Sequence, residues 1–267
     1  MNCDVEFLPC SGARPGAAGH LVMLPGWAMP GAAFAGLLPV LREHFHLTVI
    51  DLPGSAANAG VPVGGSLEAM ASTIADAAPL HASWIGWSLG GMVAACIAAN
   101  EPQRVQSLVT IGANLTFVQR AGWQAAMPEA TFDAFERDVA ADSVAALQRF
   151  LGLQCQGAVG ARDDLRLLRE LVAQRPQAPR AALLDGLAVL RSADLRHVAA
   201  DIRCPSLWIY GERDALVPAA AAEGVARRIA GAQATVLPGI AHVPFFSGSD
   251  ALRACLGRFP GFLPAPV

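Results

Sequence analysis

The sequence predicts an α/β fold with a mostly parallel, doubly wound sheet and an inserted helical segment. Apolar, strand-like segments alternate with amphipathic helical segments from residue 20 to residue 112, an order typical of parallel sheets. Strand signals stop between about residues 117 and 195 and then resume. We therefore expect one core formed by residues 1–116 and 196–267, interrupted by a helical cap at residues 117–195.

Short apolar runs that end at turn-forming residues predict the core strands. They cover residues 20–26, 45–51, the run that leads into Gly86, 105–112, 205–211 and 234–238. Ligands of such sheets bind beyond the carboxyl ends of the strands. The loops after Gly26, Ser88 and Gly112 should therefore share one face of the molecule.

Apolar residues spaced three and four apart predict the helices. In the core these are residues 32–44, 66–78, a small-residue helix from 92, 219–230 and 250–259; in the cap they are 142–154, 162–173 and 183–190.

Composition narrows the class of protein. The 267 residues are 54% hydrophobic and 15% charged, which suits one domain with a sizeable core. The net charge of −3 argues against a general nucleic-acid binder. The absence of a long apolar stretch argues against a membrane span, and the first residues lack the features of a secretory signal, so a cytoplasmic protein is expected.

The six cysteines form no C-x-x-C pair and match no zinc-site spacing. Because no secretory signal is recognised, we expect free thiols rather than disulfides. We also expect no metal and no organic cofactor.

The G-x-S-x-G motif of residues 86–90 is the strongest functional signal. An apolar run precedes it and a small-residue run follows, and this strand–turn–helix order is that of a nucleophile elbow. The turn would hold the hydroxyl of Ser88 clear of the backbone. In a chain with 26 glycines the motif alone could arise by chance, so an acid and a histidine are needed.

Asp214 and His242 fit these two roles. Asp214 follows the predicted strand 205–211 and His242 follows the predicted strand 234–238, so Ser88, Asp214 and His242 occur in the Ser–acid–His order of α/β hydrolases. His242 would accept the serine proton, and Asp214 would orient the imidazole. Glu212 remains an alternative acid, and each residue alone could be structural.

Two backbone N–H groups are candidates for an oxyanion hole. Leu89 follows the serine at a helix start, and Trp27 follows the strand that ends at Gly26. The Trp27 ring would then lie over an acyl pocket, although it could also be a core aromatic.

Six segments together resemble a known family. They are Pro25–Trp27, Asp51–Gly54, Gly86–Gly91, Arg149–Gln154, Tyr210–Asp214 and Ala241–Phe245. In these segments the chain resembles the pimeloyl-acyl-carrier-protein methyl ester esterases of biotin synthesis, the BioH family, over nearly its whole length. The resemblance implies an α/β-hydrolase fold with a cap, and a serine esterase that releases methanol from the pimeloyl methyl ester through an acyl-enzyme.

The resemblance also implies binding residues. Trp27, Leu89 and the segment from Phe150 to Gln154 would line the substrate. An acidic acyl-carrier protein would dock on cap arginines, for which Arg149, Arg162, Arg166 and Arg169 are the candidates. A solvated helix face with Asp163, Asp164 and Glu170 as partners explains the same arginines. We expect a monomer that binds neither nucleic acid nor membrane.

The chain departs from the family pattern at two loops. Pro25 stands where the family usually has histidine, and residues 55–58 differ from the usual sequence after the Asp51–Gly54 motif. Two other functions also stay open, because the triad alone does not determine the substrate. One is a general short-chain carboxylesterase or thioesterase, and the other is a non-catalytic module that binds a ligand or carrier protein.

Overall fold

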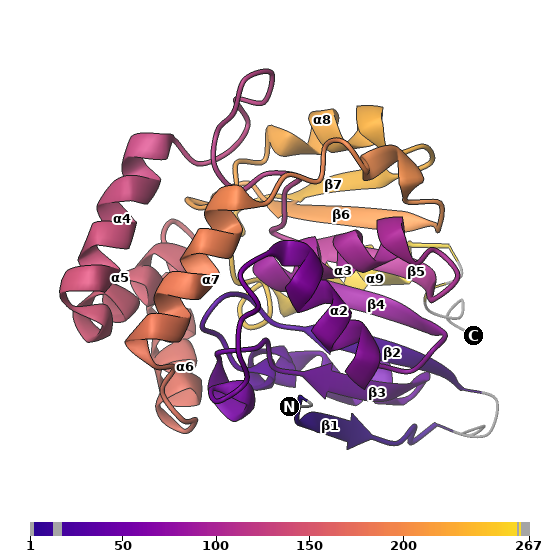
Figure 1. Cartoon of the computed structure of the whole chain (residues 1–267). Coiled ribbons are helices and arrows are strands. Elements are labelled where there is room, and N and C mark those ends of the chain that lie inside the picture. Colours follow the sequence, from indigo (N-terminus) through magenta and orange to yellow (C-terminus); the bar gives the residue numbers. More distant parts are fainter. Residues whose placement is uncertain (1–2, 13–17, 261, 263–267) are drawn as a thin grey trace.

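A computed structural model describes residues 3–12, 18–260 and 262 (Figure 1). The sheet has seven strands in the order β1-β3-β2-β4-β5-β6-β7. They are β1 (Val5–Leu8), β2 (Gly19–Leu24), β3 (Phe45–Ile50), β4 (Ala82–Trp87), β5 (Val105–Ile111), β6 (Ser206–Gly211) and β7 (Gln233–Leu237). Only β1 pairs antiparallel, with β3, and the other pairs are parallel.

Helices cover both faces of the sheet, as the doubly wound pattern predicts. The core helices are α1 (Leu38–Arg42), α2 (Leu67–Ala77), α3 (Leu89–Asn100), α8 (Ala221–Arg228) and α9 (Ser249–Gly257), with short 3₁₀ turns at Gly31–Gly36, Ala56–Asn58 and Ala199–Asp201. In Figure 1, α2, α3 and α8 lie in front of the sheet and α9 lies behind it.

Four helices lie between β5 and β6 in the sequence. They are α4 (Glu129–Ala141), α5 (Ser143–Cys155), α6 (Ala161–Ala173) and α7 (Arg180–Ser192). We call α4–α7 the helical insertion. It packs beside one end of the sheet (Figure 1), and the turns that follow β2 and β4 lie at that end. The domain limit of 117–195 stays a prediction.

Helix α3 is the centre of the core. Every residue from Leu89 to Ala99 is buried, because α3 is enclosed by α2, β4 and β5. Glycine and alanine occupy many of its positions, so its backbone lies close to the sheet. Small residues are therefore a packing requirement of this helix.

The sequence missed β1 and α4. β1 is a short edge strand with mostly exposed side chains, so it lacks a buried apolar run. In α4 only Phe132 and Val139 are buried, so few apolar positions mark this helix in the sequence.

The predicted helix 32–44 is also wrong in part. It divides into the 3₁₀ turn Gly31–Gly36 and the short helix α1, whose second position is Pro39. Proline lacks an N–H, so it is compatible with the start of a helix and not with a helix interior.

The six cysteines are free thiols, as expected. Burial raises the pKa of the Cys96 and Cys155 thiols to about 12. In the described part of the chain, no helix is long and apolar enough to cross a membrane.

Overpacking α3 should destabilise the fold. Ala94 is fully buried, so Ala94→Leu should lower the free energy of unfolding by about 1–3 kcal/mol. Ala134→Leu, on an exposed position of α4, should change it little. Urea unfolding of both variants compares the two effects, and equal midpoints would contradict the packing of α3.

Candidate active site

Ser88 lies in a strained turn between β4 and α3. Its φ of 54° and ψ of −121° are unusual for a residue other than glycine. Its backbone is held on both sides: its N–H donates to Ile111 O at 2.8 Å, and its carbonyl accepts from Gly91 N and Met92 N at 2.9 and 3.2 Å. The strand–turn–helix context predicted from the motif is therefore present.

The glycines of the motif allow a close backbone approach. A Cβ on Gly86 would lie 2.3 Å from Gly90 O, and a Cβ on Gly90 would lie 2.4 Å from both Leu24 O and Pro25 O. Real Cβ atoms do not tolerate such distances. Gly90 thus lets the start of α3 lie directly against the end of β2, beside the loop that carries Trp27.

Asp214 and His242 form a buried pair. His242 Nδ1 and Asp214 Oδ2 are 2.7 Å apart, and both side chains are inaccessible to solvent. The other carboxylate oxygen, Oδ1, accepts from Leu216 N at 2.8 Å and Val217 N at 2.9 Å. The acid is therefore fixed by its own loop and can orient the imidazole.

Glu212, the alternative acid, points elsewhere. Its carboxylate accepts from Gly239 N at 2.9 Å and from Arg213 Nε at 3.3 Å. The Gly239 N–H and the Arg213 guanidinium lower the pKa of Glu212. The hydrogen bond to His242 is made by Asp214, so the geometry favours Asp214 over Glu212.

Gly112 is a site residue whose role sequence reasoning missed. It has a φ of 55°, and a Cβ there would lie 2.9 Å from His242 Nδ1 and 3.3 Å from Asp214 Oδ2. Only glycine leaves room for the pair at the end of β5. The signal in the sequence was a glycine that directly follows a buried strand on the expected face.

His242 is held through its backbone as well. Its N–H donates to Gln154 O at 3.0 Å, and its carbonyl accepts from Trp87 Nε1 at 2.9 Å. Its Nε2 is buried and has no hydrogen-bond partner among the described residues, so it is not bonded to Ser88 Oγ. Such bonds are often long in enzymes without substrate. Ser88, Asp214 and His242 stay predicted catalytic residues.

The loop after β2 carries Trp27 and is strained at Ala28, whose φ is 58°. Asp51, after β3, braces this loop: its carboxylate accepts from Gly31 N at 2.6 Å and from Ala57 N at 3.0 Å. The N–H groups of Trp27 and Leu89 donate to no backbone acceptor among the described residues. Both are therefore available to an oxyanion, and this role stays a prediction.

The Trp27 ring joins the core to the helical insertion. Nε1 donates to Leu183 O of α7 at 3.1 Å. The ring packs edge-on against Phe135 of α4 and Phe150 of α5, with centroids 5.6 and 5.1 Å away. Three inserted helices thus fix one side chain of the core.

A cavity of about 40 Å³ lies beside Ser88. Trp27, Phe135, Phe150 and Leu187 contribute to an almost wholly apolar lining, in which Thr131 and Ser88 are the polar members. No Asp, Glu, Lys or Arg lines it. Such a lining suits an acyl chain.

Leu89 and Gln154, which were predicted to bind the substrate, are not among the residues that line the cavity. Leu89 is buried where α3 begins. Gln154 is also buried, and its Nε2 donates to Met29 Sδ at 3.6 Å. Gln154 instead supports the site through the carbonyl that accepts the His242 N–H.

Comparisons with known proteins agree with this geometry. The chain matches the family described as alpha/beta hydrolase fold over residues 19–249. A pimeloyl-[acyl-carrier protein] methyl ester esterase from Xanthomonas campestris pv. campestris (strain B100) is 41% identical over 244 residues, covering 91% of this chain and 96% of that protein. A protein of the same name from Pectobacterium carotovorum subsp. carotovorum (strain PC1) is 38% identical, covering 86% of this chain and 90% of its own length.

The chain belongs to this family of α/β-hydrolase esterases. It is a carboxylic ester hydrolase. Solved structures share the fold at lower identity. An esterase from Exiguobacterium antarcticum superposes with a TM-score of 0.79 at 22% identity, covering 94% of this chain and 92% of its own. An enol-lactonase from Burkholderia xenovorans LB400 gives 0.80 at 19%, covering 96% of both chains.

The candidate docking arginines of the esterase differ in their partners. Arg149 pairs with Asp138 at 3.0 Å, and Arg166 pairs with Glu170 at 3.3 Å. Arg162 and Arg169 are exposed and form no ion pair within the described part of the chain. The last two are therefore the more available to an anionic partner.

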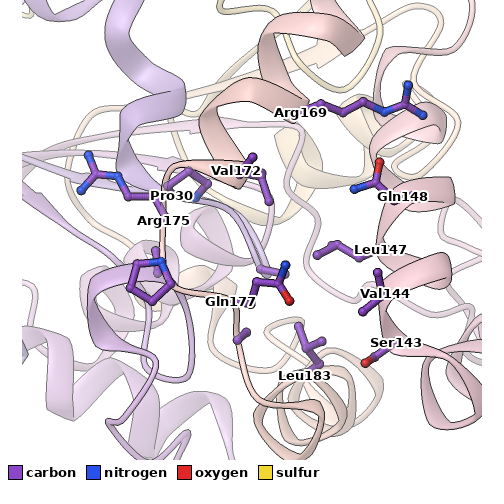
Figure 2. A pocket seen from close by; sticks show the side chains of 15 residues that line it. Pro30, Ser143, Val144, Leu147, Gln148, Arg169, Val172, Arg175, Gln177 and Leu183 are labelled. Atoms are coloured by element: carbon purple, nitrogen blue, oxygen red, sulfur yellow. The ribbon is translucent and has the colours of Figure 1, made fainter.

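Arg169 also lines a second cavity, of about 100 Å³, between α5, α6 and the core (Figure 2). Gln148 and Gln177 lie on different sides of the group of lining residues, and the side chains of Arg169 and Arg175 extend away from its centre (Figure 2). Its lining includes Ala28 and Leu183. Ala28 is the next residue after Trp27, and the carbonyl of Leu183 accepts a hydrogen bond from the Trp27 ring. The second cavity thus lies near Trp27, which lines the cavity beside Ser88.

Gly186→Ala should reduce activity in the esterase. A Cβ there would lie 2.7 Å from Trp27 Cδ1, so the ring must move and its bond to Leu183 O must weaken. We expect a roughly tenfold lower kcat/KM on a short methyl ester, because small displacements near a reacting centre are costly.

Gly152→Ala is the matched control, because a Cβ there meets no atom within 4 Å. This variant should keep wild-type activity and gain up to about 1 kcal/mol of stability, since alanine is the better helix former. Equal activity in the two variants would show that the position of Trp27 does not matter for catalysis.

Proposed function

We propose that the chain is a serine esterase that hydrolyses the methyl ester of pimeloyl-acyl-carrier protein to the free acid and methanol, in biotin synthesis. The observation that carries this proposal is the buried 2.7 Å contact between Asp214 and His242 at the end of the sheet where Ser88 occupies a strained turn. The names of relatives at 41% and 38% identity supply the substrate.

The mechanism follows from these side chains. Ser88 Oγ attacks the ester carbonyl while His242 Nε2 accepts its proton. The carbonyl oxygen becomes an oxyanion, which the N–H groups of Trp27 and Leu89 stabilise together with the positive end of α3. His242 then protonates the methoxide leaving group, so that methanol departs and an acyl-enzyme remains.

Water completes the reaction. His242 takes a proton from the attacking water, a second oxyanion forms in the same position, and the proton returns to Ser88 Oγ as the acid is released. Throughout these steps Asp214 keeps Nδ1 as the protonated nitrogen, because its Oδ2 accepts the hydrogen bond from that nitrogen. No metal or cofactor takes part in this scheme.

The two cavities support an acyl chain attached to a carrier. The apolar cavity beside Ser88 would take the ester end of the chain. The second cavity, whose lining includes two amide side chains and Arg169, suits the amide-containing arm and phosphate of phosphopantetheine. The acidic carrier protein would then contact the exposed faces of α5 and α6.

A general short-chain esterase is the second candidate. The small volume next to Ser88, about 40 Å³, favours short acyl groups. Turnover of carrier-bound and free esters distinguishes the two functions. We further propose that the protein is a cytoplasmic monomer and that the acyl-carrier protein is its binding partner.

Ser88→Ala should abolish methanol release from pimeloyl-acyl-carrier-protein methyl ester, with a loss of more than about 10⁴-fold, because the nucleophile is removed. Asp214→Asn should lose roughly 10³–10⁴-fold. Glu212→Gln, the matched control, should stay within about twofold, since Glu212 does not contact His242. A folded Ser88→Ala protein that still releases methanol would exclude the proposed mechanism.

Reversing the unpaired arginines should weaken docking of the carrier. The double substitution Arg162→Glu and Arg169→Glu should raise KM for the carrier-bound ester roughly tenfold at low salt, because it opposes an acidic partner. KM for a free methyl ester should not change. Arg227→Glu, on the distant helix α8, should leave both KM values unchanged. An equal rise in KM for both esters would count against carrier docking on these helices.

A further inference from the structure

The segment from Gln154 at the end of α5 to Asp164 at the start of α6 is hydrogen-bonded at three points to the loop that carries His242. Gln154 O accepts from His242 N at 3.0 Å, and Val159 N donates to Gly239 O at 3.4 Å. At the far end, Asp164 binds Ser247. The start, middle and end of the loop 239–247 are therefore attached to the helical insertion and not only to the core.

Asp164 makes the strongest of these contacts. Oδ1 accepts from Ser247 N at 3.1 Å and Oδ2 accepts from Ser247 Oγ at 2.6 Å. Its exposure is 2%, and no ion pair involves it in the part of the chain that the structure describes. Both oxygens of a buried carboxylate are thus satisfied by one residue of the His242 loop.

The local backbone is shaped for this contact. Asp164 lies in the first turn of α6, where the helix dipole favours a negative charge. The residue before α6 is Gly160, with a φ of 87°, and a Cβ there would lie 2.9 Å from Ser247 Cβ. Glycine therefore allows the start of α6 to approach Ser247 closely.

A buried carboxylate that pairs with no cation contributes little to the stability of a fold. Its desolvation is costly, and replacement of buried charges by apolar residues is often neutral or stabilising. A paired hydrogen bond to one loop does, however, fix the position of that loop. Asp164 is better explained by the geometry of residues 239–247 than by stability alone.

We infer that Asp164 is a positioning residue for the catalytic base: by holding Ser247 it fixes the loop of His242 in the geometry that Asp214 and Ser88 require. The inference rests on the proposed function, because it takes His242 as the base. It also makes the helical insertion part of the catalytic apparatus, since the insertion sets the position of the base as well as covering the substrate.

The test compares three variants at this contact. Asp164→Ala removes both hydrogen bonds. Ser247→Ala removes only the bond to Oγ. Asp164→Asn can keep both, because Oδ1 can accept from Ser247 N while Nδ2 donates to Ser247 Oγ. Steady-state kinetics on p-nitrophenyl butanoate, well below the unfolding midpoint of each variant, give kcat and KM separately.

Asp164→Ala should lower kcat roughly tenfold or more with KM within about twofold, because a displaced base impairs chemistry more than binding. Ser247→Ala should lower kcat by a smaller factor, and Asp164→Asn should restore it to near the wild-type value. If Asp164→Ala does not fold, the comparison of Ser247→Ala with Asp164→Asn tests the inference. An unchanged kcat in Ser247→Ala would then overturn it.

Two controls separate positioning from stability. Leu168→Ala removes a fully buried side chain from the same helix but neither of the two hydrogen bonds to Ser247, so it should lower the unfolding midpoint and spare kcat. Asp163→Asn, an exposed neighbour, should change neither. If Leu168→Ala loses as much kcat as Asp164→Ala, the contact is merely structural and the inference fails.

Fluorophosphonate labelling of Ser88 distinguishes this failure from failure of the proposed function. A wild-type protein that is folded and does not label would overturn the proposed function and with it this inference. A wild type that labels rapidly, with Asp164→Ala labelling equally fast, would overturn the positioning role alone. Slower labelling in Asp164→Ala, restored in Asp164→Asn, supports it.

Discussion

The close approach of α3 to the end of β2 is the constraint on which the rest of the structure depends. Gly90 packs against the carbonyl groups of Leu24 and Pro25, at distances that no side chain would allow. This contact fixes the turn of Ser88 beside the loop of Trp27. Because α3 is buried along nearly its whole length, the turn cannot relax without disturbing the core. The strained φ of Ser88 is stable only because these neighbours hold it.

A second group of contacts connects the core to the helical insertion. The Trp27 ring is held by α4, α5 and α7, and the His242 loop is held by the segment from Gln154 to Asp164. The insertion therefore positions both the Trp27 ring, which lines the cavity beside Ser88, and the loop that carries His242. Changes in the insertion can alter the shape of the cavity beside Ser88 and the position of His242 together.

The sequence predicted the features that depend on short-range pattern. The parallel strands follow from apolar runs that end at turns, and the Ser88 turn follows from its glycines and its position between a strand and a helix. The sequence favoured Asp214 as the acid but left Glu212 as an alternative, because both follow the same strand, and the hydrogen bond of Asp214 to His242 separates them in three dimensions.

Long-range packing explains what the sequence did not reveal. The role of Gly112 depends on a histidine 130 positions later in the chain. The tie between Asp164 and Ser247 spans 83 residues. Gln154 was expected to line the substrate, but its side chain turns toward Met29 and its carbonyl supports His242. A motif gives the identity of a residue, whereas the fold decides which of its atoms are used.

The neutral lining of the cavity beside Ser88 has a consequence for the end of the catalytic cycle. No acidic or basic side chain lines it, so a neutral ester would enter it with little loss of solvation. Hydrolysis converts that ester into a carboxylate, which is poorly solvated among Phe135, Phe150 and Leu187. The neutral substrate would therefore be compatible with the apolar lining, whereas the charged product would not. In the proposed reaction, the charge that hydrolysis creates would therefore favour release of the product from this cavity.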